Sequence, residues 1–193
     1  MSESSKRRQP LKPTRWQPPP LIGQALLLTT ASPSGEPHLE PTTRVCPLCD
    51  DPPLVGVALD DGTLGCRQLM KTKGFVINIV SAELAQVWWA AGHEGYRGLE
   101  RINRLGIELE PAETVAAPRI VECPAQLECR LEERKKLPGA TLFIGRVTAY
   151  LLASRVEYAA TARQRLKLLD PCFWLRGEED LYSSLKQPRR VQG

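Results

Sequence analysis

Apolar and polar positions between residues 54 and 80 follow one another in blocks that predict a strand, a helix and a second strand. Leu54 to Leu59 is a short apolar run with turn residues on both sides, which is typical of a buried strand. After a turn at 60–62, Thr63 is a good N-cap for a helix that runs to Lys73. The β-branched run from Phe75 to Val80 predicts the second strand. The apolar positions of the helix have the i, i+3, i+4 spacing of one buried face: Cys66, Leu69 and Met70.

Most other segments predict strands with short connections, which favours antiparallel pairing. Ser81 begins a second helix whose apolar positions repeat at helical spacing until Gly92 stops it, and residues 99–105 predict a short third helix. Because strands outnumber helices, we expect a mainly β fold, a barrel or sandwich with peripheral helices. Pro41 lies in a polar, threonine-rich segment and predicts an edge strand there. The expected strands are Ala25 to Thr30, His38 to Val45, Pro124 to Arg134 and Thr141 to Leu152, the last two as a hairpin.

The chain has 193 residues, enough for one domain with a substantial core. We expect that domain over residues 19–185, between a basic, proline-rich arm (1–18) and a flexible tail (186–193), because neither end can bury much apolar surface. No apolar run approaches the ~20 residues that span a bilayer and no signal peptide opens the chain, so we expect a cytoplasmic protein without membrane contact. The net charge of +4 comes from mixed-sign segments, which argues against nucleic-acid binding.

Arg67 is an unexpected residue near the start of the predicted helix. A cation there opposes the positive end of the helix dipole, at a cost of a few tenths to ~1 kcal/mol. A bound anion, held by free backbone N–H groups and the guanidinium, would explain the residue. A surface ion pair with Asp60 or Asp61 is the alternative, and the segment favours neither over the other.

Six cysteines lie at positions 46, 49, 66, 123, 129 and 172. In a chain of this size without a leader they are expected to be thiols and not a disulfide framework. Cys129 alternates with polar neighbours, so that Ala125, Leu127, Cys129 and Leu131 share one face of a strand and Gln126, Glu128, Arg130 and Glu132 the other. We expect Cys129 to pack in the core, and Cys123 and Cys172 to pack as well.

Several blocks, in order and spacing, resemble the flavin reductase-like proteins, which bind FMN on a split β-barrel and include the flavoredoxins. The resemblance covers residues 22 to about 182. It rests on Leu28-Thr29-Thr30, Ser34-Gly35-Glu36-Pro37-His38, Pro41-Thr42-Thr43, Asp51-Pro52-Pro53-Leu54-Val55, Gly74-Phe75-Val76-Ile77-Asn78, Ser81-Ala82-Glu83-Leu84 and Leu142-Phe143-Ile144-Gly145-Arg146-Val147.

The resemblance implies an FMN-binding split β-barrel that acts as an oxidoreductase, with NAD(P)H as electron donor. In the family FMN lies at a dimer interface, so a homodimer is implied as well. The FMN phosphate would lie at the start of the helix, near Thr63 and Arg67. The flavin ring would rest on the segment from Thr42 to Asp50. The cofactor-binding residues implied are Thr42, Thr43, Arg44, Val45, Cys46, Cys49, Thr63, Arg67 and Asn78.

The chain also departs from the family pattern. Many members carry a histidine in the hairpin before the last long strand, where this chain has Ala140, and an asparagine where it has His38. The alternative to a reductase is therefore a flavin-binding electron carrier or a non-catalytic FMN-binding dimer. We name no catalytic residue and predict no metal site.

Two further features bear on function. The pair Cys46 and Cys49 forms a C-x-x-C motif in the segment expected to face the flavin; it could be a redox dithiol, half of a zinc site, or two thiols without a role. Trp88 shares a helical face with Leu84 and Ala91 and should pack on the barrel. Trp89, its neighbour, would be left at the helix edge, to be buried by a second copy of the chain or by the loop that follows Gly92.

Overall fold

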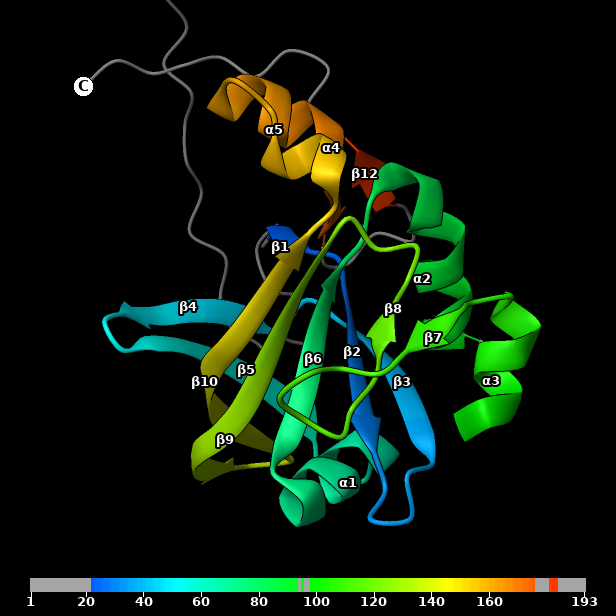
Figure 1. Ribbon diagram of the computed structural model, residues 1–193. Coiled ribbons are helices and arrows are strands. Elements are labelled where there is room, and N and C mark those ends of the chain that lie inside the picture. Colours follow the sequence, from blue (N-terminus) through cyan, green and yellow to red (C-terminus); the bar gives the residue numbers. More distant parts are fainter. Residues whose placement is uncertain (1–21, 94, 96–97, 176–180, 184–193) are drawn as a thin grey trace, which may run out of the picture.

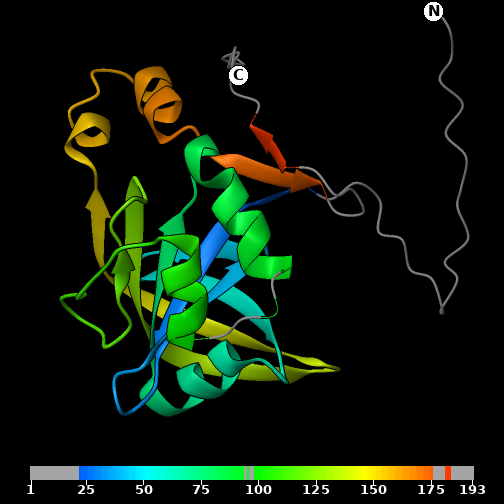
Figure 2. The same cartoon turned by 90° about the vertical axis from the view of Figure 1, so that its right-hand side faces the viewer.

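The computed structural model describes residues 22–93, 95, 98–175 and 181–183, and it is built on a strongly twisted antiparallel sheet (Figures 1 and 2). The sheet has seven strands in the order β3-β2-β6-β9-β10-β5-β4. They are β2 (Leu26–Ala31), β3 (Pro37–Thr42), β4 (Val45–Asp50), β5 (Pro53–Asp60), β6 (Gly74–Ile79), β9 (Ala125–Leu137) and β10 (Ala140–Leu152).

Smaller elements surround this sheet. β1 (Ile22–Gln24), β11 (Cys172–Leu175) and β12 (Leu181–Ser183) form a three-stranded sheet, and β7 (Leu109–Glu110) pairs with β8 (Arg119–Ile120). The helical elements are α1 (Leu64–Thr72), η1 (Ala82–Leu84), α2 (Ala85–His93), α3 (Gly98–Leu105), α4 (Ser154–Glu157) and α5 (Ala162–Leu169). Figure 1 shows α1 at one end of the large sheet, α2 and α3 beside β3, and α4 and α5 at the opposite end.

Two hydrophobic clusters hold these layers together. The first lies inside the curved sheet and includes Phe75 and Phe143, with Cys66 and Leu69 of α1 closing one end. The second packs β2 and β3 against α2 and α3, and Trp88 belongs to it. The Trp88 indole N–H donates to the carbonyl of Leu26 at 2.9 Å, which satisfies its polar atom inside the cluster.

The fold confirms the mainly β class with peripheral helices. The predicted helix begins as expected, since the Thr63 hydroxyl accepts from the Cys66 amide at 3.2 Å, and it ends at Lys73 in a left-handed conformation with φ of 60°. The predicted hairpin is β9 and β10, and the third helix is α3. The expected burial of Cys123, Cys129 and Cys172 is confirmed.

Some elements differ from the expectation. The second helix runs one residue past Gly92 and ends at His93. The strand expected from His38 to Val45 is divided into β3, which ends at Thr42, and the edge strand β4, which begins at Val45. The polar face of β9 starts with two buried side chains, Gln126 and Glu128.

The expected arm (1–18) and tail (186–193) lie outside the described residues. Within the described part of the chain, none of the helices combines the length and the apolar sequence that crossing a bilayer requires.

Candidate functional site

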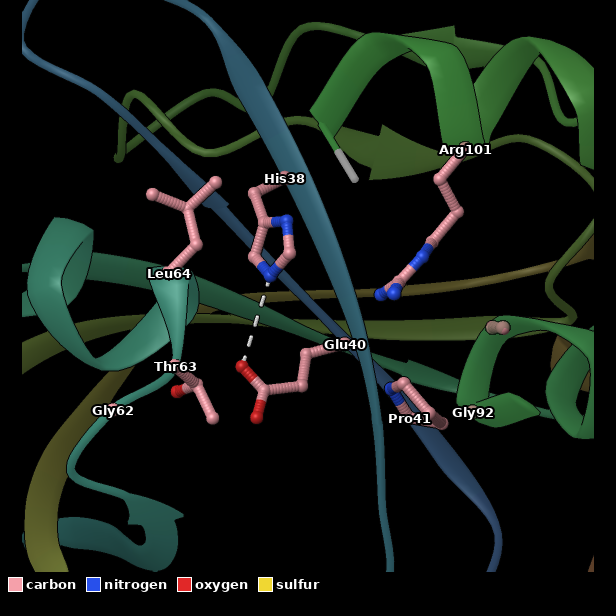
Figure 3. A pocket seen from close by; sticks show the side chains of 9 residues that line it. His38, Glu40, Pro41, Gly62, Thr63, Leu64, Gly92 and Arg101 are labelled. Carbon is pink, nitrogen blue, oxygen red and sulfur yellow. Dashed lines mark ion pairs between the residues drawn. The ribbon is translucent and has the colours of Figure 1, made fainter. Parts of the chain in front are cut away.

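A cavity of about 400 Å³ lies across the edge strand β3, between the start of α1 and the helices α2 and α3 (Figure 3). This volume is in the range of small-molecule sites. β3 contributes His38, Glu40 and Pro41, and α3 contributes Arg101. The segment Gly62–Leu64 before and at the start of α1 forms the opposite wall.

The alternation of β3 brings two titratable side chains to the same place. His38 and Glu40 are two residues apart, so they point to one face of the strand, toward α1 (Figure 3). The His38 Nε2 and Glu40 Oε2 atoms are 3.8 Å apart. Gly65 makes room for this pair, because a Cβ at that position would lie 2.4 Å from the Glu40 Oε2. The first turn of α1 is therefore packed directly against a carboxylate.

Two buried polar atoms of this pair are left without a hydrogen bond. His38 is 4% exposed and the Glu40 side chain 17%, yet His38 Nδ1 and Glu40 Oε2 have no hydrogen-bond partner among the described residues. Leaving such an atom unsatisfied costs about 1–3 kcal/mol. A ligand that hydrogen-bonds to these atoms in the cavity would recover that free energy.

The start of α1 adds positive potential to the same wall. The Thr63 hydroxyl satisfies the amide of Cys66, and the first amides of any helix lack partners within the helix. Arg67 is exposed and donates from Nη1 to the carbonyl of Gly62 at 2.7 Å. Asp60 accepts two hydrogen bonds from Arg44, and Asp61 pairs with Lys136. Arg67 therefore closes the turn before α1, and its role toward an anion stays a prediction.

Arg101 brings a cation into the cavity from the other side. Its guanidinium points from α3 toward β3 in Figure 3, and Nη1 donates to the carbonyl of Leu39 at 3.0 Å. This hydrogen bond ties α3 to the edge strand, which has no strand neighbour beyond it within the seven-stranded sheet. Arg101 and the start of α1 therefore line the same cavity as the Glu40 carboxylate.

The segment predicted to face the flavin ring lies along β4 and the turn before it. Thr42 is buried, and its hydroxyl accepts from the Arg44 amide at 3.1 Å. The hydrogen bonds to Asp60, each 2.8 Å, raise the pKa of Arg44, and the charge of Asp60 adds to the effect. Val45 packs against the inner cluster. Thr43 is half-buried, and its side chain lies close to the Gly23 backbone.

Cys46 and Cys49 are exposed on β4, away from the cavity. Asn78 is fully buried, and its amide group donates to the Leu27 carbonyl at 3.0 Å and accepts from the Ile120 amide at 3.0 Å. Asn78 therefore holds the framework together, and its position does not support the assignment to the cofactor. A side chain without exposed surface cannot touch a ligand in this conformation.

Of the predicted site residues, the structure places Thr63 in the cavity wall. Sequence reasoning passed over His38 and Glu40 as binding groups, although their spacing on a strand already puts them on one face. It also did not include Arg101 among the binding residues. Its place in the cavity depends on how α3 packs on β3, which the sequence pattern does not contain.

Residues 21–169 match the family described as "Flavin reductase like domain". The chain belongs to this family. The resemblance inferred from the sequence is thereby confirmed.

Two solved structures share the fold of this family member at low sequence identity. Flavoredoxin of Desulfovibrio vulgaris (Miyazaki F) is 19% identical, with a TM-score of 0.80 over 98% of this chain and 97% of that one. Nitrilotriacetate monooxygenase component B from Bacillus cereus is 16% identical, with a TM-score of 0.80 over 97% of this chain and 100% of that one. An uncharacterized protein of Pyrococcus abyssi is 35% identical over 52% of this chain and 57% of its own length.

The cavity residues fit the polar chain of a flavin nucleotide, which carries hydroxyl groups and a phosphate. The unsatisfied atoms of His38 and Glu40 match hydroxyl groups, and the α1 start with Arg101 matches an anion. The charge of Glu40 works against the phosphate, because like charges repel in a partly buried site. These residues would therefore hold the hydroxyl groups of such a chain, and Glu40 would limit the gain from its phosphate.

Proposed function

We propose that this protein is a homodimeric FMN-binding oxidoreductase that takes reducing equivalents from NAD(P)H. The flavin, when bound, supplies the hydride and electron chemistry. The chain's own residues bind and orient it: the α1 start and Arg101 take the phosphate end, and His38 with Glu40 takes the hydroxyl groups. Thr42 to Asp50, the turn before β4 and β4 itself, is the segment against which the ring would rest.

The observation that carries this proposal is the cavity at β3, where a buried atom of His38 and one of Glu40 lack hydrogen-bond partners among the described residues, beside a helix start. Buried polar atoms of a folded protein are normally satisfied, so a pair of exceptions in one cavity indicates a place for a ligand. The family to which the chain belongs supports a flavin as that ligand.

Titration with FMN tests the proposal. We expect quenching of flavin fluorescence that saturates near one FMN per protomer, and an altered flavin absorbance spectrum. A His38→Ala variant should bind more weakly, and an exposed variant such as Glu36→Gln should match the wild type. Unchanged flavin fluorescence at saturating protein would refute FMN binding.

An electron carrier without nicotinamide-dependent activity is the second candidate. The observation that favours it is Ala140, which pairs with Asp60 and Leu137 at the hairpin where many family members carry a histidine. Oxidation of NADH and NADPH with added FMN separates the two candidates. Turnover supports the reductase, and flavin binding without turnover supports the carrier.

We also propose that the dimer buries Trp89. This side chain is 41% exposed in the single chain and stacks on His93, with ring centroids 4.0 Å apart. An aromatic pair of this kind suits an interface core. Light scattering at micromolar concentration should give a dimer, and Trp89→Glu should weaken it. A Trp89→Glu variant that dimerises as the wild type does would remove Trp89 from the interface.

A further inference from the structure

The C-x-x-C motif lies on the outermost strand of the large sheet, where both thiols are exposed. β4 pairs with β5 alone, so its other edge has no strand beside it in the described sheet. Every β4 residue after Val45 is exposed, and Figure 1 shows β4 with β5 extending to one side of the molecule. Cys46 and Cys49 are therefore open to molecules in solution.

A β-bulge puts the two cysteines on the same face of this hairpin. In a regular strand, residues three apart point to opposite faces. Here the register slips between Pro47 and Cys49, so Leu48 is the extra residue, and Cys46 pairs with Gly56 while Cys49 pairs with Leu54. Gly56 and Leu54 are two apart on β5 and share a face, so their partners share it too. The bulge therefore puts both thiols on one face of the hairpin, over which the Leu48 side chain also reaches.

The residue opposite Cys46 is Gly56, so no β5 side chain stands directly across from its thiol. A Cβ added at Gly56 would lie 3.5 Å from the Cys46 Sγ and 3.2 Å from the Leu48 Cδ1, so the Leu48 side chain reaches over the same glycine. The Cys46 side chain itself remains exposed. Within the described residues, no group of three or more metal-ligating side chains includes this pair, which favours thiol chemistry over a metal site in the single chain.

The other four cysteines are buried: Cys66, Cys123, Cys129 and Cys172. Burial raises the pKa of Cys123 and of Cys129 to about 12 and that of Cys172 to about 11. Thiols in such surroundings are inert because the thiolate is the reactive form. The chain thus separates four core thiols from one exposed pair.

We propose that Cys46 and Cys49 are a thiol–disulfide exchange site that closes reversibly to an intramolecular disulfide on reaction with a small disulfide such as oxidised glutathione. One thiolate attacks the disulfide, forms a mixed disulfide and expels one glutathione thiol. The second thiolate attacks the mixed disulfide, forms the 46–49 bond and expels the other. Two protein thiols are oxidised, one disulfide is reduced, and the two protons end on the two glutathione molecules.

The hydrogen bonding indicates which of the two thiols reacts first. The Cys49 thiol donates to the Asp51 carbonyl at 3.2 Å, a contact that only the protonated form makes. The exposed Cys46 thiol makes no such hydrogen bond among the described residues, so it is the attacking thiol and Cys49 resolves the mixed disulfide. This assignment needs no flavin, so its test is independent of the proposed function.

The experiment is equilibration of the native, flavin-free protein with mixtures of reduced and oxidised glutathione, followed by acid quenching and peptide mass spectrometry. We expect the 46–49 disulfide to form and to reopen as the proportion of reduced glutathione rises. The four buried cysteines should stay unmodified in the native protein and react in denaturant, which provides the internal control.

Single variants test the order. Cys49→Ser should accumulate a glutathione adduct on Cys46, and Cys46→Ser should accumulate at least tenfold less adduct on Cys49 at early times. Circular dichroism confirms that these surface variants stay folded. Absence of the 46–49 bond at every glutathione ratio would overturn the proposal, as would crosslinks between chains only, or a purified protein whose two thiols are blocked by stoichiometric zinc.

Discussion

Two carboxylates on different strands of the large sheet, one fully buried and one partly buried, have opposite surroundings. Glu128, on β9, is fully buried and accepts hydrogen bonds from the Glu113 amide and from the amide and hydroxyl of Thr114, at 2.7–3.1 Å. Arg119 adds an ion pair at 3.5 Å. Glu40, on β3, has one oxygen without any hydrogen-bond partner among the described residues.

The difference separates framework from site. Glu128 holds the loop between β7 and β8 in place, and both of its carboxylate oxygens already accept hydrogen bonds from that loop. Glu40 is packed against a helix start with its bonding incomplete, beside a cavity. A satisfied buried charge stabilises one conformation, whereas an unsatisfied one gains from whatever enters.

The largest effect should come from Glu128→Gln. The amide would present N–H groups to the Thr114 and Glu113 donors and leave Arg119 without its buried partner, so we expect a loss of about 3–5 kcal/mol in unfolding free energy. Urea denaturation measures it. The matched control is Glu132→Gln, whose exposed pair with Arg146 should contribute below about 1 kcal/mol. Equal losses in the two variants would contradict the contrast.

The stability of the protein in acid should depend on the same carboxylate, Glu128. Burial is the largest single influence and raises the pKa of Glu128, but the hydrogen bonds from Glu113 and Thr114, with Arg119, together lower it below its ordinary 4.5. A lowered folded-state pKa gives stability that is present above the unfolded-state pKa and lost as pH falls through the folded-state value. The urea midpoint of the wild type should therefore fall more steeply below about pH 4.5 than that of Glu128→Gln. Parallel curves would remove Glu128 from acid stability.

Arg67→Ala tests the other side of the comparison, the binding of an anion at the start of α1. If Arg67 leaves the Gly62 carbonyl to contact the FMN phosphate, its loss should weaken FMN by roughly ten- to hundredfold, about 1.5–3 kcal/mol. Riboflavin, which lacks the phosphate, should change little. Lys71→Ala, an exposed cation at the far end of α1, is the control. Equal weakening of FMN and riboflavin would place the phosphate elsewhere.

The smallest change in FMN affinity is expected from Glu40→Gln, which should tighten binding where Arg67→Ala weakens it. Removing the charge beside the α1 start should tighten FMN about tenfold, roughly 1.4 kcal/mol, because phosphate no longer meets a carboxylate. Riboflavin should bind as before or somewhat more weakly. Fluorescence titrations with FMN and with riboflavin give the ratio of their two dissociation constants. If this ratio is the same in the variant and the wild type, Glu40 does not face the phosphate end.

Much of the framework could be predicted because each of its segments follows the hydrophobic spacing of a single type of element, either a helix or a strand. Thr63 followed by Cys66 and Leu69 identified α1, and the turn at Pro138-Gly139 identified the hairpin. α5 was not predicted, although Ala162, Leu166 and Leu169 have helical spacing; none of its residues is buried in the structure. β4 was not predicted as a strand, since exposed side chains and Pro47 hide a strand whose pattern a bulge interrupts.

The site was harder to predict, because its residues are brought together by packing between elements. Thr63 follows from local cap chemistry, whereas the approach of Glu40 to Gly65 depends on how α1 lies over β3. The alternation on β9 correctly placed Cys129 in the core but missed the burial of Glu128. That burial comes from a loop about fifteen residues earlier in the chain, which the strand pattern cannot show.

The order of strands also sets when this protein can fold during its synthesis. β5 and β6 are separated in sequence by little more than α1, yet they do not pair with each other; the β9–β10 hairpin is inserted between them, β9 on β6 and β10 on β5. Until the ribosome has released residues 125–152, two long apolar strands therefore keep an open edge. At ordinary elongation rates of about 5–20 residues per second that interval lasts several seconds, during which an unpaired strand edge can associate with the edge of another chain.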